Sequence, residues 1–241
     1  LNSGNDRGRI YRIHRKNAPQ NPPMTLVDAP PEALLAALSH PNRWRRQTAS
    51  RRLLDFPDAR TELRALAGSA ESAWARFHAL HTLEAVGELD DATLAARLQD
   101  PDPEIRRNAV TLCMRSHPGP LTRAALRTRV SDPHIPTRFE VAKAAAGLPM
   151  EERAPLIHAL ARSDANHPWF RTVLRASGHS VSWELLALAL KTEDDSMAQW
   201  RRDCVRSVSR DQESASQAID AILEHPGDHD ALALAHASVD A

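Results

Sequence analysis

The chain has 241 residues, of which 42% are hydrophobic, 26% are charged and only 4% are aromatic, and it contains eight glycines. A β-sandwich or barrel would need more aromatic and β-branched residues, whereas abundant Ala, Leu, Arg and Glu favour helices, so we predict an all-α fold. The 31 Lys and Arg residues balance 31 Asp and Glu residues, which argues against a dedicated nucleic-acid-binding protein because such proteins usually carry a basic excess.

Residues 1–31 differ in pattern from the remainder. The alternation of Arg9-Ile10-Tyr11-Arg12-Ile13 predicts one β-strand, which is not stable by itself. We therefore expect residues 1–31 to hold the terminal strand of a preceding domain and an extended linker. Five prolines indicate the linker: Pro19, Pro22, Pro23, Pro30 and Pro31. The start at Leu1, without an initiator Met, favours a piece of a longer protein.

From residue 32 to residue 241 the pattern becomes helical and repeats. An arginine recurs at intervals of 30, 30, 32, 33 and 30 residues, near the start of every second predicted helix. We call these residues the ladder arginines: Arg46, Arg76, Arg106, Arg138, Arg171 and Arg201. Three residues after each stands a small or aliphatic residue: Ala49, Ala79, Ala109, Val141, Leu174 and Cys204.

Each repeat therefore predicts a pair of antiparallel helices. The second helices are expected at residues 42–54, 72–86, 103–116, 135–147, 168–178 and 197–210, with a last pair at 214–224 and 229–238. Neither helix of a pair can bury its apolar stripe alone, so six to seven pairs should stack into a continuous helical solenoid. The period and the arginine register resemble the HEAT-like repeat, also described as an armadillo-like helical array. The sequence has no run of 18 apolar residues, so we expect no membrane insertion by this segment.

The ladder arginines allow two interpretations. In the first, each bonds an acidic residue or a helix-end carbonyl of a neighbouring repeat and fixes the stacking. In the second, they form a basic stripe that binds an anionic partner. Arg97 is expected on an exposed helix face and so outside this set.

Four tryptophans recur close to ladder arginines: Trp44, Trp74, Trp169 and Trp200. The simpler expectation is that they pack between repeats. The alternative is that they are aromatic anchors for a protein partner.

Metal, haem and catalytic sites are not expected. His78 and His81 share a helix face with Glu84, but no further ligand is identifiable, and His225 and His229 lie across a Pro-Gly break. The segment that starts at Cys113 resembles the haem signature C-x-x-C-H but has Ser116 where the second cysteine would stand. We therefore predict no catalytic residue, no cofactor and a small buried side chain at Cys113.

Residues 8–13, the Pro-rich linker and the segments at 39–49 and 74–84 together resemble large membrane-bound dehydrogenases of planctomycetes and verrucomicrobia. In that family a sugar-dehydrogenase-like β-propeller precedes HEAT-like repeats and a c-type cytochrome domain. The resemblance implies that this chain is the non-catalytic scaffold that links or docks these redox modules, in the periplasm or at the cell surface. Its partners would be other domains of the same chain or a separate protein.

Two other functions were weighed against this scaffold. One is a stand-alone HEAT-repeat module for protein–protein interaction. The other is a nucleic-acid-binding HEAT protein of the alkyl-purine glycosylase type, which the zero net charge disfavours.

Overall fold

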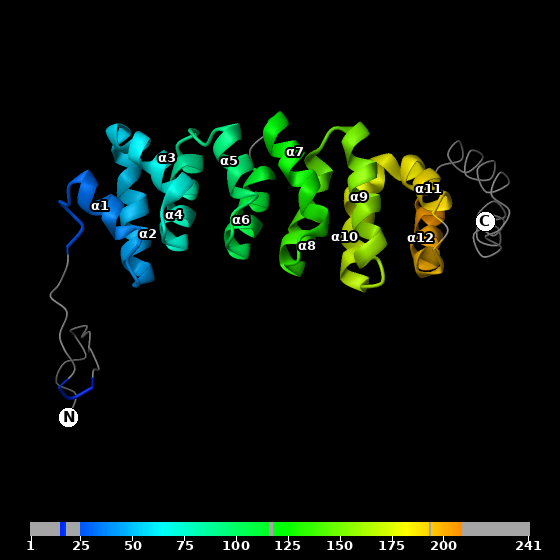
Figure 1. Cartoon of the computed structure of the whole chain (residues 1–241), viewed down its shortest axis with the longest axis horizontal. Coiled ribbons are helices and arrows are strands. Elements are labelled where there is room, and N and C mark those ends of the chain that lie inside the picture. Colours follow the sequence, from blue (N-terminus) through cyan, green and yellow to red (C-terminus); the bar gives the residue numbers. More distant parts are fainter. Residues whose placement is uncertain (1–14, 18–24, 116–117, 193, 209–241) are drawn as a thin grey trace, which may run out of the picture.

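The computed structural model describes residues 15–17, 25–115, 118–192 and 194–208. These residues form twelve α-helices and six short 3-10 helices and contain no β-strand. Successive helix pairs follow one another along the long axis of the molecule (Figure 1). The predicted all-α HEAT-like solenoid is thereby confirmed.

Each layer of the stack consists of an A helix and the B helix that follows it. The A helices are α1 (Pro31–Ala37), α3 (Arg60–Ser69), α5 (Asp91–Arg97), α7 (Pro120–Thr128), α9 (Met150–Asp164) and α11 (Ser182–Leu190). The B helices are α2 (Arg43–Arg52), α4 (Ala73–Ala85), α6 (Pro103–Cys113), α8 (Ile135–Ala144), α10 (Pro168–Gly178) and α12 (Ala198–Val208). Every B helix contacts the next B helix, so the second helices form an unbroken row.

The six B helices lie where the arginine register places them. The predicted strand at residues 9–13 and the predicted helices at 214–224 and 229–238 lie outside the described residues. The division into residues 1–31 and 32–241 remains a prediction.

Short polar side chains and prolines set the helix starts. The side chains of Asn42, Ser72, Asp90 and Asp102 accept hydrogen bonds from amides in the first turns of α2, α4, α5 and α6. Proline occupies a first-turn position in α1, α6, α7, α8 and α10, where a missing N–H costs nothing.

Small residues let neighbouring B helices approach closely. The residues three positions after the ladder arginines are all buried: Ala49, Ala79, Ala109, Val141, Leu174 and Cys204. They join the leucines of the A helices in one continuous core. A core that runs through every layer makes each repeat dependent on its neighbours.

Polar contacts also join successive A helices, which the sequence did not indicate. Arg64 of α3 pairs with Glu88 before α5 at 2.5 Å, and Arg123 of α7 pairs with Glu152 of α9 at 3.1 Å. Asp91 of α5 accepts hydrogen bonds from the amides of Leu121 and Thr122, both at 3.0 Å. Asp91 therefore caps α7 across the layer boundary.

This cap requires glycine at position 119. Gly119 is the N-cap residue of α7 and supplies no side-chain bond, so the carboxylate of Asp91 takes that role. A Cβ atom at position 119 would overlap the same carboxylate.

We predict that Gly119→Ala lowers the free energy of unfolding by about 1–2 kcal/mol, the usual value of a lost N-cap. Urea denaturation measures the difference. Gly147→Ala is the matched control, because a Cβ atom there meets nothing within 4 Å. Equal stability of the two variants would show that Asp91 does not hold α7.

Candidate functional site

The ladder arginines lie in the first turn of each B helix and reach back over the preceding turn. Nη1 of Arg46 donates to the carbonyls of His40 and Pro41 at 2.7 and 2.8 Å. Nη1 of Arg76 donates to the carbonyls of Ala70 and Glu71 at 2.7 and 3.0 Å. Because backbone carbonyls in such a turn have no helical partner, each guanidinium fixes the turn that joins the A helix to the B helix of its own layer.

The other four ladder arginines repeat this contact. Their Nη1 atoms donate to carbonyls of the preceding turn at 2.7–3.4 Å: Arg106 to Asp100 and Pro101, Arg138 to Asp132, Arg171 to Ala165 and Asn166, and Arg201 to Thr192 and Asp194.

The remaining guanidinium nitrogens of three ladder arginines bind a carboxylate of the next layer. Nε and Nη2 of Arg76 donate to the two oxygens of Asp100, both at 2.8 Å. Arg106 binds Asp132 in the same way at 2.7 and 2.9 Å, and Arg138 binds Asp164 at 2.8 and 2.7 Å. This two-pronged geometry matches the planar guanidinium to the planar carboxylate.

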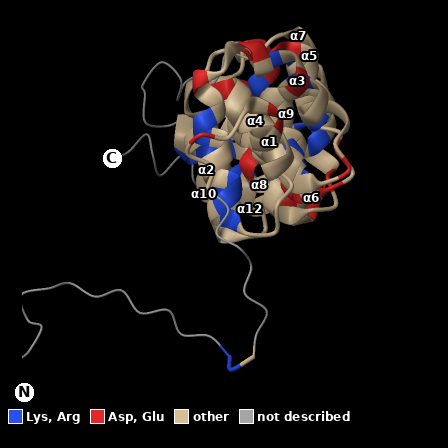
Figure 2. Ribbon diagram, turned by 90° about the vertical axis from the view of Figure 1, so that its left-hand side faces the viewer, with Lys and Arg blue, Asp and Glu red and all other residues tan. Residues whose placement is uncertain are grey.

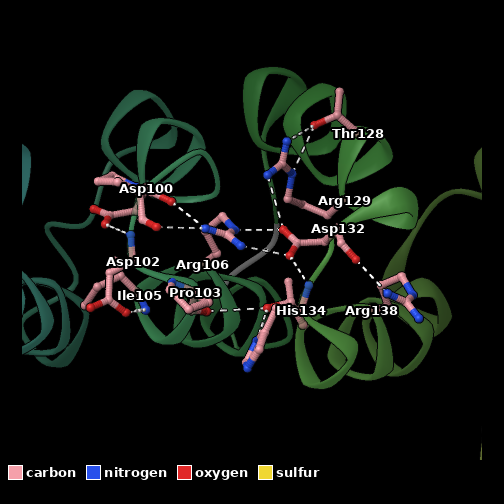
Figure 3. A network of polar contacts seen from close by, with 12 residues as sticks. Asp100, Asp102, Pro103, Ile105, Arg106, Thr128, Arg129, Asp132, His134 and Arg138 are labelled. Carbon is pink, nitrogen blue, oxygen red and sulfur yellow. Dashed lines mark hydrogen bonds and ion pairs between the residues drawn. The ribbon is translucent and has the colours of Figure 1, made fainter.

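Two of these aspartates, Asp100 and Asp132, also touch the arginine of their own layer. The carboxylate of Asp100 accepts from Arg76, while its backbone carbonyl accepts from Arg106 at 2.9 Å. Asp132 likewise joins Arg106 to Arg138, as Figure 3 shows. A chain of charged groups therefore runs through four layers without interruption.

Residues 31–115 match the family of HEAT repeats. They span the first three layers, α1 to α6, and are a HEAT-like repeat segment. No curated protein matches this chain.

A second arginine reinforces two of the aspartates, Asp100 and Asp132. Nη1 of Arg97 donates to Asp100 at 2.7 Å, and Nη1 of Arg129 donates to Asp132 at 3.2 Å. The expectation that Arg97 is exposed is wrong, since only 14% of its side chain is exposed. The Asp100 side chain lies three residues after Arg97, one helical turn away, and draws the guanidinium inward.

Electrostatics at Asp132 favour the charged form. Burial by itself would raise the pKa of Asp132, but hydrogen bonds from Arg106 and the His134 amide and the nearby arginine charges outweigh it and lower that pKa. The hydrogen bond to Asp132 raises the pKa of Arg106, and the one to Asp164 raises the pKa of Arg138. The Arg106–Asp132 pair therefore stays ionised while buried.

The ends of the ladder differ from its middle. Arg171 reaches Asp203 of α12 through a single contact of 3.5 Å. At the other end, the position equivalent to Asp100 is Ala70, so Arg46 has no carboxylate there. Its Nε instead donates to Nε2 of His78 at 3.4 Å, and its guanidinium lies over the ring of Trp74 at 4.3 Å.

Three of the four tryptophans that recur near the ladder arginines face solvent. The exposed fractions of Trp44, Trp74 and Trp169 are 60%, 55% and 71%, so the expectation that they pack between repeats is wrong. They stand two residues before a ladder arginine, whereas Trp200 stands one residue before Arg201. One residue rotates a helix position by about 100°, which turns Trp200 into the core with 1% exposed. Trp200 is therefore unavailable as a partner-binding aromatic.

The surroundings of the described histidines and cysteines fit side chains that pack in the core and do not fit a metal site or a nucleophile. Within the described residues, no three His, Cys, Asp or Glu side chains come together as a metal site requires. Burial raises the pKa of the Cys113 thiol to about 12 and also raises the pKa of Cys204, so neither is a ready nucleophile. His225, His229 and His117 lie outside the described residues.

Nothing in the described part of the chain suits a bilayer crossing: none of its helices is both long enough and apolar enough.

We predict that Arg76→Ala lowers the free energy of unfolding by about 3 kcal/mol, because it leaves the buried carboxylate of Asp100 with one arginine fewer. Arg76→Lys should restore only part of the loss, since an ammonium cannot bind both oxygens in the planar arrangement. Urea denaturation of the three proteins tests this.

The matched control for Arg76 is Arg107→Ala. Arg107 pairs with Glu104 on the exposed surface of α6, with 40% of its side chain exposed, and such pairs contribute about 0–1 kcal/mol. If both alanine variants unfold at the same urea concentration, the ladder does not hold the stack.

We predict that His78 makes stability depend on pH between about 6.5 and 4. Burial, and then the charge of Arg46, lowers the pKa of His78 from 6.5 to about 4. The unfolded chain binds a proton in this interval that the folded protein excludes, so stability falls as the pH decreases through it. His78→Gln should reduce this fall in urea denaturation at pH 7.5 and pH 4.5, whereas the exposed His179→Gln should leave it unchanged.

Proposed function

We propose that this chain is a non-catalytic repeat scaffold that links or docks redox modules in a larger sugar or alcohol dehydrogenase–cytochrome protein. The observation that carries the proposal is the chain of buried ion pairs from Arg76 to Asp164, which joins consecutive layers. The HEAT-repeat match supports a protein-interaction scaffold. The dehydrogenase context rests on the resemblance of residues 8–13, 39–49 and 74–84.

A stack joined in this way suits a spacer between redox centres. Electron transfer depends on a fixed geometry between donor and acceptor, and a flexible linker would let that geometry vary. In a repeat array each layer constrains only its neighbours, so stiffness along the array requires strong contacts at every boundary. Two-pronged Arg–Asp pairs at three boundaries provide such contacts.

The alternative function is a stand-alone HEAT-repeat module for protein–protein interaction. The exposed rings of Trp44, Trp74 and Trp169 favour it, because large aromatic side chains on a surface commonly anchor partners. In that function no electron would cross the chain.

Expression of the complete reading frame that encodes this chain distinguishes the two functions. A scaffold between redox modules predicts a protein with covalently bound haem, detected by its absorption after denaturation, and with sugar- or alcohol-dependent reduction of that haem. Arg106→Ala should slow this internal electron transfer without changing the haem content. A reading frame without haem and without a propeller domain would favour the stand-alone module.

A further inference from the structure

The face formed by α2 and α4 has features that the other layers lack. We propose that this face binds a short, extended, acidic segment of a protein partner. The inference rests on the proposed scaffold function and adds to it the position of a docking site and the chemistry of the partner.

Positive charge accumulates in the first layer. The ten residues of α2 include five arginines and no acidic residue: Arg43, Arg45, Arg46, Arg51 and Arg52. In the end-on view of Figure 2, blue Lys and Arg positions lie beside the neighbouring labels of α2, α10 and α12. Among the ion pairs within the described residues, none includes Arg43, Arg46 or Arg51. The chain as a whole is neutral, so this layer concentrates charge that later layers neutralise with aspartate.

Two exposed tryptophans lie on the same face. Trp44 of α2 and Trp74 of α4 occupy equivalent positions on helices that contact each other. The ring of Trp74 is held over the buried guanidinium of Arg46 at 4.3 Å. A ring oriented in advance loses little conformational freedom when a partner side chain packs on it.

A cleft of about 480 Å³ lies between α2 and α4. Gln47, Ser50 and Arg51 of α2 and His78 of α4 line it. Trp44, Gln47 and Arg51 follow the i, i+3, i+7 spacing of one helix stripe. His78 follows Trp74 by four residues, which places both on one side of α4. Tryptophans, arginine and cleft therefore form one continuous surface.

The dimensions suit a short extended peptide. From Trp44 to Arg51 the helix rises about 10 Å, which an extended chain covers in about three residues. Apolar side chains would pack on Trp44 and Trp74, and a carboxylate would bind Arg51 at the far end of the cleft. Because no ion pair within the described residues includes Arg43, Arg46 or Arg51, an acidic partner that binds them need not displace an existing pair.

Nucleic acid fits this face less well. Recognition of a phosphate backbone uses a basic stripe that follows many successive charges. Here the ladder arginines Arg76, Arg106 and Arg138 are bound to Asp100, Asp132 and Asp164. The five arginines of α2 lie within ten residues that include no acidic residue, and a basic segment of this length matches a short acidic peptide.

Fluorescence anisotropy with three labelled peptides tests the proposal. Each peptide alternates Leu with one other residue, which is Glu in the first, Gln in the second and Lys in the third. The three peptides are otherwise identical. We expect the Glu peptide to bind at least about tenfold more tightly than the Lys peptide and to weaken with added NaCl. Arg51→Glu and Trp74→Ala should each reduce its affinity about tenfold or more.

The chain supplies matched controls at equivalent repeat positions. Lys143 stands five residues after its ladder arginine, as Arg51 does, and Trp169 stands two residues before its own, as Trp74 does. Lys143→Glu and Trp169→Ala should leave the affinity for the Glu peptide unchanged. Circular dichroism confirms that all four variants fold.

Three outcomes would overturn the proposal: no binding of the Glu peptide, an equal loss in the control variants, or binding of a labelled oligothymidylate as tight as that of the Glu peptide. The last outcome would assign the face to nucleic acid. A wrong scaffold proposal gives a different result: the protein from the complete reading frame contains no haem, while the Glu peptide still binds. Absence of peptide binding in a haem-containing protein would reject the docking site alone.

Discussion

The contact on which the rest of this structure depends is the buried ion pair between a ladder arginine and an aspartate of the next layer. Two of these aspartates, Asp100 and Asp132, also offer their backbone carbonyl to the arginine of their own layer. A buried charge is costly unless it is paired and hydrogen-bonded on all sides. The pair is therefore stable only when both layers are correctly placed, and it converts a stack held by apolar contacts into one with a defined register.

The need of each ladder arginine for a carboxylate from the next layer also explains why the first layer differs from those that follow. Replacement of the aspartate by Ala70 leaves Arg46 with backbone carbonyls, His78 and the face of Trp74. An aromatic ring compensates a cation less fully than a carboxylate does. Positive charge thus remains at the α2–α4 face, where exposed tryptophans and a cleft are also found. One substitution in a repeat therefore turns a stacking element into a candidate docking surface.

Several features were predictable from sequence because they depend on periodicity. The arginine interval located all six described B helices, and the small residues three positions later identified the tight helix contacts at Ala49, Ala79 and Ala109. The tryptophans were not predictable from the same pattern, because a difference of one position separates exposed Trp169 from buried Trp200. Arg97 was misplaced because its partner Asp100 is fully buried and is also bound by Arg76 of the preceding layer.

The sequence by itself determined the helical class, the repeat length and the positions of the arginines, because helix periodicity and turn residues are local properties of the chain. The tertiary structure decided which carboxylates Arg76, Arg106 and Arg138 bind and that Asp91 caps α7 across a layer boundary. These contacts join residues 24 to 31 positions apart. Only the stacking of one layer on the next brings such residues within hydrogen-bond distance.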